Sequence, residues 1–295
     1  MGNPKAFLTI HRKEAGYRPV NERVCDFSEV EQTLNTHDRR EQASRCMDCG
    51  VPFCHWACPL ENKCPEWNDA LYKGKWELAY KILTSTNPFP EFTGRICPAL
   101  CEKSCVLQLT MHEPTTNRED ECAIMERAWQ ESYITPCPPA KRTGKSVAII
   151  GAGPAGLSAA WYLNKQGVSV EVFDANPMAG GLLRYGIPNF KLQKEVIDRR
   201  IKLMEEEGVI FHFGVRVDLK QDAFSMEDVE KTIGKHDAYI IATGTPIARD
   251  LNIPGRELKG VYLALELLSQ QNRILDGEKP DAASLVNAKG KRVLV

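Results

Sequence analysis

The sequence lacks the features that direct a chain into or through a membrane. No run approaches the roughly 20 consecutive apolar residues of a membrane-spanning helix, and the N-terminus has no apolar core long enough for a signal peptide. Gly2 does not begin a myristoylation signal, because Ala6 stands where that signal needs serine or threonine. We therefore expect a soluble, cytoplasmic protein.

The chain also lacks an excess of charge of either sign. Its 38 lysine and arginine residues nearly balance 39 aspartate and glutamate residues, for a formal net charge of −1. Since no long basic tract is present, nothing points to nucleic acid or an anionic membrane as a partner. Internal repeats and low-complexity tracts are absent too. The 295 residues are enough for about two domains, each with its own core.

Cysteine, by contrast, is abundant and unevenly placed. Nine of the 11 cysteines lie between Cys46 and Cys122. In a chain without an export signal, closely spaced cysteines are more often metal ligands than disulfide partners. Seven of them form two groups, spaced C-x2-C-x4-C-x3-C-P and C-P-x2-C-x3-C: Cys46, Cys49, Cys54, Cys58, Cys97, Cys101 and Cys105.

This pattern predicts two iron–sulfur clusters. Bacterial ferredoxins use a similar run, C-x2-C-x2-C-x3-C-P, whose last cysteine binds the other cluster of a pair. Seven thiols exceed the four ligands of one tetrahedral zinc ion, although C-x2-C pairs also build zinc sites. Zinc, or a set of buried structural thiols, is the alternative that the spacing leaves open.

The cysteine-rich part is expected to be helical. Helix-favouring residues predict a helix over His37–Cys46, with Thr36 as the N-cap, and a further helix is expected over Ala123–Tyr133. The stretch Trp67–Thr84 is predicted to form two short helices that are interrupted near Gly74. All five tryptophans are interpreted as core residues.

A proline-rich stretch, residues 136–139, is interpreted as the linker to a second domain. A strand, a glycine loop, a helix and a second strand follow it, which is a βαβ unit. The predicted strands are Lys145–Ile150, Val168–Phe173, Ile210–Phe213 and Asp237–Ala242. The predicted helices are Leu157–Lys165, Gln193–Glu207 and Tyr262–Asn272.

The glycine loop has the pattern of a dinucleotide site. Its residues are Gly151, Ala152, Gly153, Pro154, Ala155 and Gly156. In such a loop the first glycine makes a tight turn, the second lets a pyrophosphate approach, and the third lets helix and strand pack closely. Asp174, at the end of the next strand, would accept hydrogen bonds from ribose hydroxyls. The alternative is a glycine-rich turn in a domain that binds no nucleotide, and the loop alone does not separate FAD from NAD.

Six segments along the whole chain carry a resemblance to a known family: residues 45–55, 65–69, 89–99, 151–157, 180–188 and 254–261. With them the chain resembles the small (beta) subunits of glutamate synthase and the N-terminal half of dihydropyrimidine dehydrogenase. The resemblance implies an α-helical double [4Fe-4S] domain over residues 1–140 and an α/β, Rossmann-like FAD-binding domain over 141–250. Residues 251–295 would be a connection ending in the first strand of an NADPH-binding domain. Relatives continue beyond Val295, so the chain is expected to be a fragment, a split gene product or a truncated protein.

The resemblance also divides the metal ligands between two clusters. One cluster takes Cys46, Cys49, Cys54 and Cys105. The other takes Cys58, Cys97, Cys101 and a non-cysteine ligand, for which Glu126 is the match. Residues 115–121 look inserted, and Cys122, four residues before Glu126, is the alternative eighth ligand. Cys64, where relatives usually have an apolar residue, is interpreted as structural, as are Cys25 and Cys137.

By the same resemblance, FAD lies at the glycine loop. Its further contacts would be Gly181, Leu182, Leu183, Lys191, Val217, Ala242, Thr243 and Gly244. From the sequence alone, four of these residues have equally good explanations without a flavin. Leu182 and Leu183 could be core residues, Lys191 a surface residue and Val217 a residue of a strand.

The implied activity is electron transfer without a catalytic acid or base. Electrons would pass from NADPH or NADH through FAD and two [4Fe-4S] clusters to FMN on a large (alpha) subunit. That partner would make glutamate from glutamine and 2-oxoglutarate. One alternative is a related oxidoreductase whose redox partner, at the far end of the electron-transfer chain, is sulfide, a pyrimidine or ferredoxin. The other is a non-catalytic iron–sulfur adaptor, which docks a partner and passes electrons on.

Overall fold

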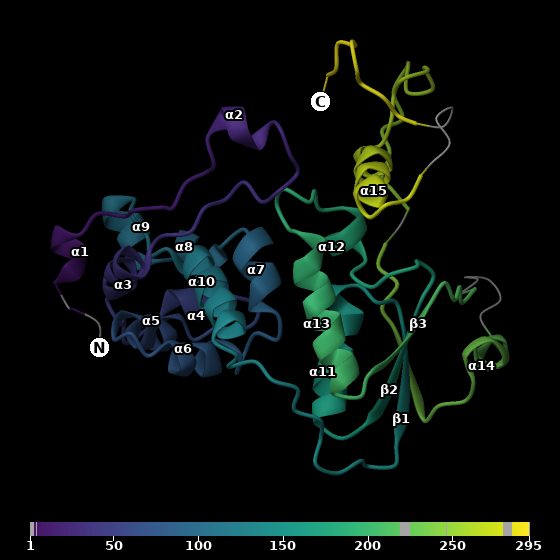
Figure 1. The fold of residues 1–295 in the computed structure, drawn as a ribbon, viewed down its shortest axis with the longest axis horizontal. Coiled ribbons are helices and arrows are strands. Elements are labelled where there is room, and N and C mark those ends of the chain that lie inside the picture. The colour runs from purple at the N-terminus through teal and green to yellow at the C-terminus, as the bar shows by residue number, and fades with distance from the viewer. Residues whose placement is uncertain (1–2, 4, 219–224, 246, 280–284, 295) are drawn as a thin grey trace. The chain divides into compact units, whose positions relative to one another are not determined.

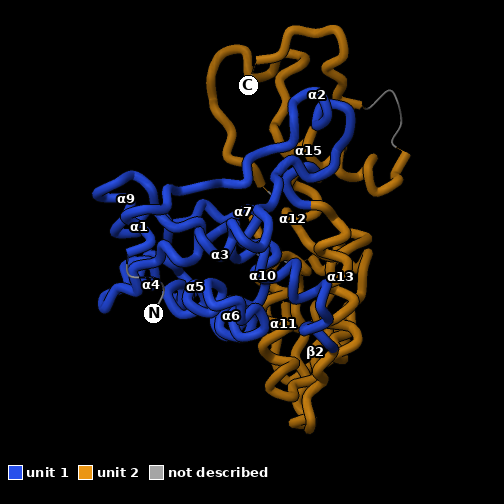
Figure 2. The backbone as a smooth tube through the Cα atoms, turned by 60° about the vertical axis from the view of Figure 1, so that its left-hand side comes forward, with its two compact units in different colours: residues 1–135, 190–192 blue, residues 136–189, 193–295 orange. Residues whose placement is uncertain are grey.

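The computed structural model describes residues 3, 5–218, 225–245, 247–279 and 285–294 (Figure 1). The chain divides into two units, residues 1–135 with 190–192, and residues 136–189 with 193–295 (Figure 2). Each unit has its own core. In the described parts of the chain, no helix is both long and apolar enough to cross a membrane.

The first unit is built of helices around a core of fully buried side chains, among them Trp67, Leu71, Leu83, Ile124 and Met125. Its longest helix, α10, packs against α7, α6 and α5, and α3 packs against α5. The helices are α1 (Ala6–Thr9), α2 (Val20–Arg23), α3 (Thr36–Ser44), α4 (Phe53–Ala57), α5 (Cys64–Tyr72), α6 (Trp76–Leu83), α7 (Pro90–Ile96), α8 (Leu100–Lys103), α9 (Val106–Met111) and α10 (Asn117–Gln130).

Local signals explain where several of these helices begin and end. The break near Gly74 is confirmed, because α5 ends before this glycine and α6 begins after it, with a glycine φ of +73°. The cap of α3 is Asn35 and not Thr36, since the Asn35 side chain accepts the Asp38 N–H at 2.9 Å. Helix α10 begins at Asn117, six residues before the predicted start at Ala123.

One tryptophan departs from the expected burial. Trp67 and Trp76 are in the core of the first unit, and Trp161 is buried in the second. Trp56 is 75% exposed, so its interpretation as a core residue was wrong. It lies on α4, a five-residue helix without a buried residue, and its edge-to-face contact with Phe53 leaves most of the indole exposed.

The second unit contains a four-stranded parallel sheet. Its strands have the order β3-β2-β1-β4, and every neighbouring pair is parallel. Each predicted strand is confirmed to within one residue at either end: β1 (Ser146–Ile150), β2 (Ser169–Asp174), β3 (Ile210–Phe213) and β4 (Ala238–Ile241).

Helices cover both faces of this sheet. Helix α11 packs against β1 and β2, while Val229 and Ile233 of α14 contact Ala148, Ile150 and Phe173. Because side chains alternate between the faces of a strand, β1 must be apolar almost throughout to satisfy both helices. The helices of this unit are α11 (Pro154–Lys165), α12 (Leu182–Tyr185), α13 (Lys194–Glu206), α14 (Met226–Ile233) and α15 (Ala264–Leu275).

The strand expected at the end of the chain is not seen in its described part. Residues 291–294 have no strand geometry, and Val295 lies outside the described residues. The Lys291 N–H donates to the Ala288 carbonyl at 3.0 Å, within a turn. A strand forms only where a neighbouring strand takes up its backbone hydrogen bonds, and residues 291–294 are paired with none of the four described strands.

Candidate functional site

Four cysteines from distant parts of the sequence line one cavity in the first unit. Cys46 and Cys49 follow α3, Cys54 is on α4, and Cys105 precedes α9. Cys64, the first residue of α5, lines the same cavity. The structure therefore brings together the four cysteines that the resemblance assigns to one cluster.

Two of these thiols, those of Cys46 and Cys49, do not ionise readily on their own, whereas the neighbouring Cys64 lowers the pKa of Cys54. Burial, together with the charges of Cys54, Cys105 and Cys49, raises the pKa of the Cys46 thiol to about 12. Burial likewise raises the pKa of Cys49. Several thiolates this close together repel one another, and a cationic centre among them removes that penalty. The donor set therefore fits a metal centre bound by thiolates.

The three cysteines assigned to the other cluster are also neighbours in this unit. Burial raises the pKa of Cys97, and the charges of Glu121, Cys101 and Cys58 raise it further. Cys58 follows α4, Cys97 follows α7 and Cys101 is on α8. Among the charges that act on the Cys97 thiol is one carboxylate, that of Glu121.

The two cysteine loops share an unusual backbone conformation. Asp48, two residues after Cys46, has a φ of 51°, and Ala99, two residues after Cys97, has a φ of 54°. The Ala99 N–H donates to the Cys97 sulfur at 3.4 Å, and the backbone of Asp48 acts on the Cys46 thiol by lowering its pKa against the larger effect of burial. This left-handed conformation is unfavourable for residues other than glycine. Its occurrence at matching positions points to a role, because N–H groups aimed at cysteine sulfurs tune iron–sulfur clusters.

The spacing of the sulfurs favours clusters over single zinc ions. With Zn–S bonds of about 2.3 Å, the sulfurs of a tetrahedral site stand only about 4 Å apart. No three cysteine sulfurs of this chain, all of which the structure describes, lie within 4.8 Å of one another. An iron–sulfur cube holds its cysteines on different iron atoms and hence farther apart.

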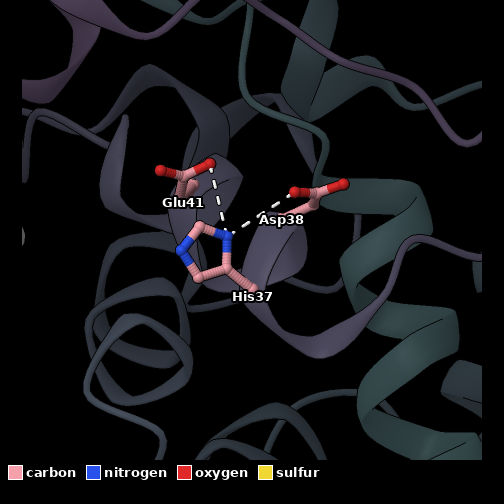
Figure 3. A group of neighbouring side chains, drawn as sticks. All are labelled: His37, Asp38 and Glu41. Atoms are coloured by element: carbon pink, nitrogen blue, oxygen red, sulfur yellow. Dashed lines mark ion pairs between the residues drawn. The ribbon is translucent and has the colours of Figure 1, made fainter.

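One group of described side chains does have its possible ligand atoms within 4.8 Å of one another. It consists of His37, Asp38 and Glu41 on α3 (Figure 3). His37 Nδ1 lies 3.6 Å from Asp38 Oδ1 and 3.7 Å from Glu41 Oε2, and the imidazole is 79% exposed. Asp38 also pairs with Lys13. Acidic side chains at the start of a helix are stabilised by its dipole, so these contacts require no metal.

Glu121 is a site residue that the sequence analysis missed. Its side chain is buried, and it accepts hydrogen bonds from Asn62 Nδ2 at 2.8 Å and from Thr93 Oγ1 at 3.1 Å. Neither partner carries a positive charge, and burial raises the pKa of Glu121 to about 7. A buried carboxylate without a cation is costly. A metal ion bound beside Cys97 would supply the missing positive charge.

The two residues that the sequence offered as the eighth ligand have other surroundings. Arg95 Nη1 donates to Glu126 Oε1 at 3.0 Å. Cys122 packs against Gly94 of α7, where a Cβ would lie 2.7 Å from the Cys122 backbone nitrogen. Burial raises the pKa of the Cys122 thiol to about 11. Both residues line a cavity with Arg95, and none of the seven clustered cysteines is among its described lining residues.

Helical periodicity could have revealed Glu121. Asn117, Glu121, Ile124 and Ala128 are all buried, and they recur on one face of α10. Extending the apolar face backward from Ile124 by one turn places Glu121 in the core. The expected helix start at Ala123 cut off that turn.

In the second unit, the glycine loop lies between β1 and α11, at the carboxyl end of the sheet. At Gly151, φ is +112° and a Cβ would lie 2.4 Å from the Ala242 carbonyl oxygen, just after β4. At Gly156, a Cβ would lie 1.9 Å from the Gly151 oxygen. Only glycine lets the three backbone segments approach this closely. By contrast, the nearest atom to a Cβ at Gly153, apart from its own neighbours in the chain, would be Gly181 Cα at 4.0 Å.

Asp174, at the end of β2, orients this loop. Its Oδ2 accepts the Ala152 N–H at 2.7 Å, and its Oδ1 accepts two hydrogen bonds from Asn176, at 2.8 and 3.0 Å. Each carboxylate oxygen has about two acceptor positions, so Oδ2 keeps one for a hydroxyl of a ligand. The expected ribose contact is compatible with this geometry.

Gly180 and Gly181 lie next to the glycine loop, at the same edge of the sheet. The Gly180 N–H donates to the Ala152 oxygen at 2.8 Å, and a Cβ at Gly181 would lie 2.9 Å from Gly153 Cα. Pro154 and Ala155 form the first turn of α11. Residues 242–244 follow β4, which lies beside β1 where the strand order reverses. In open parallel sheets, nucleotides bind at such a point.

The remaining expected flavin contacts differ in their surroundings. Leu183 is buried, whereas Leu182 is 57% exposed. Val217 packs against the hydrophobic core between the sheet and α14. Lys191 belongs to the three residues that group with the first unit, where its ammonium pairs with Glu31. Of these four, Leu182 is the residue whose side chain is most open to a ligand.

Together, the two units define a redox protein with a cysteine-rich helical domain before a nucleotide-type α/β domain. Residues 23–132 match the family described as dihydropyrimidine dehydrogenase domain II, 4Fe-4S cluster. Residues 145–295, just over half of the chain, match the family described as pyridine nucleotide-disulphide oxidoreductase. The chain belongs to this oxidoreductase family.

Over its whole length, the chain is similar to parts of glutamate synthases. The chain is 45% identical over 299 residues to the glutamate synthase [NADPH] small chain of Mycobacterium tuberculosis, covering 100% of this chain and 60% of the relative. It is 41% identical over 306 residues to that of Bacillus subtilis, with the same coverage. Glutamate synthase [NADH] of Schizosaccharomyces pombe is 43% identical over 294 residues, which are 99% of this chain but 14% of the relative. The chain therefore spans about three fifths of the small chains it matches.

Solved structures are less similar. FprA of Mycobacterium tuberculosis in complex with NADPH is 28% identical, with a TM-score of 0.37, over 43% of this chain and 29% of that chain. This similarity adds nothing to the assignment.

Proposed function

We propose that the chain is the flavin and iron–sulfur part of a glutamate synthase small subunit. It would pass electrons from NADPH or NADH, through FAD and two [4Fe-4S] clusters, to a larger partner. The observation that carries this proposal is the gathering of seven cysteines into two groups in one unit, on a chain whose other unit has a nucleotide-type glycine loop.

The first cluster would be held by Cys46, Cys49, Cys54 and Cys105. The second would be held by Cys58, Cys97, Cys101 and Glu121. Glu121 replaces Glu126 in this proposal because it is buried beside Cys97 without a cationic partner, whereas Glu126 is paired with Arg95. The Asp48 and Ala99 N–H groups would then stabilise the thiolate ligands of one cluster each.

We place FAD in the Rossmann-like domain, with its pyrophosphate at the glycine loop and α11 N-terminus. Gly153 leaves room for the phosphates, and Asp174 Oδ2 has a free acceptor position for a ribose hydroxyl. A bound flavin accepts two electrons as hydride and releases them singly, which suits one-electron clusters. The helical cluster domain would cover residues 1–140 and the FAD domain residues 141–250. Residues 251–295 would lead toward an NADPH-binding domain.

The partner would be the large subunit of glutamate synthase, with FMN as the electron acceptor. It would make glutamate from glutamine and 2-oxoglutarate. The fungal relatives support a large partner, because the segment that matches this chain is only 14% of one relative and 13% of another. All 11 cysteines are free, which suits the reducing cytoplasm as the place of action.

The test of this proposal is the cofactor content of the purified chain. We expect about eight iron atoms per chain, as two [4Fe-4S] clusters require, with sulfide and FAD. Zinc without iron would refute it, and iron without any flavin after incubation with FAD would support the adaptor function instead. Electron paramagnetic resonance of the reduced chain should show two cluster signals.

We further propose that the partner docks over α4, which lies directly at the clusters. Cys54 is on this helix and Cys58 follows it, while Trp56 and Phe53 are 75% and 48% exposed. The two rings pack edge to face, with centroids 6.4 Å apart. Exposed aromatic pairs of this kind are common at the centres of protein interfaces. Docking here would bring the partner's acceptor close to both cysteine groups.

Trp56→Ser is expected to weaken binding of the large subunit by about tenfold or more, which is the usual effect of losing an interface tryptophan. Binding is measured by titration of one subunit against the other, with iron content as the control for cluster assembly. Tyr162→Ser, which changes an aromatic residue 44% exposed in the second unit, is the matched variant and should bind normally. Equal affinity of the Trp56→Ser protein and the original chain would contradict docking over α4.

A further inference from the structure

Two buried amide side chains lie beside the thiols of the first proposed cluster. Asn68 of α5 and Asn117, the first residue of α10, are 0% and 1% exposed. Both line the cavity that also contains the four cysteines of the first proposed ligand set. Neither residue belongs to a proposed ligand set. A buried amide is costly unless its polar atoms find partners, so the hydrogen bonds of this pair decide what it does here.

A backbone carbonyl fixes the orientation of both amides. The Cys64 carbonyl can only accept, so the Asn68 atom that lies 2.9 Å from it must be the nitrogen, Nδ2. The same nitrogen donates to Asn117 Oδ1 at 3.0 Å. Both hydrogens of Asn68 Nδ2 are then in use. The Asn117 oxygen is therefore turned toward Asn68, and the Asn117 nitrogen is turned away from it.

This arrangement leaves the Asn117 nitrogen as a donor. Within the described residues, Asn117 Nδ2 makes no hydrogen bond. Asn68 Oδ1 is enclosed without a partner, whereas Asn117 Nδ2 is not among such enclosed atoms. The Asn117 nitrogen therefore borders open space, and the space that Asn117 lines is the cavity with the four cysteines. The pair leaves the Asn68 oxygen unsatisfied, at about 1–3 kcal/mol, while it turns two N–H groups toward the thiols.

We propose that Asn117, oriented by Asn68, donates a hydrogen bond to a sulfur of the first cluster or of its cysteine ligands and raises the reduction potential of that cluster. Hydrogen bonds to the sulfurs help to set the reduction potential of an iron–sulfur cluster. A donor favours the reduced state, because that state carries more negative charge. The inference rests on the ligand sets of the proposed function.

The second cluster would have a different neighbour on the same helix. Glu121, its proposed oxygen ligand, follows Asn117 by one turn of α10. A neutral donor therefore faces one proposed ligand set and a carboxylate belongs to the other. A change at Asn117 should for this reason affect the potential of one cluster and not that of both.

Three variants test the role of Asn117. Asn117→Leu fills a similar volume without a donor, whereas Asn117→Asp still accepts from Asn68 but turns an oxygen toward the cavity. Thr116→Val is the matched control. Thr116 is also 0% exposed and donates to Asp120 Oδ2 at 3.0 Å, but it is not among the residues that line the cavity. All three are compared with the original chain by iron content, thermal unfolding and a redox titration followed by electron paramagnetic resonance.

We expect about eight iron atoms in the leucine and valine variants, as two [4Fe-4S] clusters require. In Asn117→Leu one reduction should become about tenfold less favourable, or about 59 mV for one electron, while the other is unchanged. Asn117→Asp should lower the same potential further, because a carboxylate oxygen replaces the donor. Thr116→Val should leave both potentials unchanged.

Two results would overturn the inference. One is that Asn117→Leu and Asn117→Asp keep their iron and leave both potentials unchanged. The other is that Thr116→Val lowers the same potential as much as Asn117→Leu does, since a loss of packing would then be sufficient. If Asn117→Leu does not fold, Asn117→Asp decides, because it keeps the hydrogen bond from Asn68. Either result leaves the proposed function intact, because that proposal fails only if the original chain lacks iron or flavin.

Discussion

Glu121→Ala is expected to remove one of the two clusters, so that iron falls from about eight to about four atoms per chain. The reason is that the other three members of this group, Cys58, Cys97 and Cys101, leave one coordination position to a residue beside Cys97, and Glu121 is buried there. Iron analysis gives the stoichiometry. Electron paramagnetic resonance of the reduced protein shows whether one signal is lost while the other is kept.

The fold should survive this change. The carboxylate is a costly group in the metal-free protein, since burial raises its pKa to about 7 despite the hydrogen bonds from Thr93 and Asn62. Removing it leaves Asn62 and Thr93 without one partner each, at a cost of about 1–3 kcal/mol per group. Circular dichroism should therefore show the normal helix content. This separates loss of a ligand from loss of the domain.

Glu126→Ala is the matched control, because Glu126 lies on the same helix and its carboxylate is paired with Arg95. We expect this variant to keep about eight iron atoms, the content of two [4Fe-4S] clusters. If Glu126→Ala loses a cluster and Glu121→Ala does not, the proposed ligand set is wrong. Loss of the same signal in Cys122→Ala alone would assign the eighth position to that thiol.

The structure explains why the sequence pointed to the cysteines but not to Glu121. Seven thiols at short spacings signal a metal site by their chemistry alone. Glutamate, however, is common on exposed helix faces, and the stretch Asn117–Glu121 is polar throughout. What distinguishes Glu121 is its burial against Asn62 and Thr93, which come from 59 and 28 residues away. Helical periodicity can place Glu121 on the buried face of α10, but no local pattern shows which distant residues pack against it.

The same contrast holds for the fold. The strands of the sheet could be predicted to within one residue, because β1 and β2 are short apolar runs between clear turns. Trp56 was misjudged because hydrophobicity predicts burial only where other elements supply neighbours. Lys191, which is expected at the flavin, also has a distant partner in Glu31, 160 residues earlier in the chain. Interactions of this range depend on the folded chain and not on local composition.

Gly153→Ala is expected to remove flavin binding while the domain stays folded. The backbone of Gly153 has a φ of −76° and a ψ of 180°, which alanine adopts easily. Apart from the neighbours in the chain, the nearest atom to an added Cβ would be 4.0 Å away. The added methyl group would occupy the space through which a pyrophosphate approaches the backbone. We expect at least about tenfold weaker FAD binding, or about 1.4 kcal/mol, with unchanged iron content and unfolding temperature. Binding is measured by titration with FAD and flavin fluorescence.

Gly156→Ala should behave differently, and the comparison locates the nucleotide. Here a Cβ would lie 1.9 Å from the Gly151 oxygen, so α11 and the loop must separate whether or not a ligand is present. This variant should lower the unfolding temperature as well as remove flavin. If Gly153→Ala bound FAD as tightly as the original chain, the pyrophosphate would not lie at this loop. If the nucleotide lies on the loop, Gly153→Ala should lose only flavin binding, whereas Gly156→Ala should lose both flavin binding and stability.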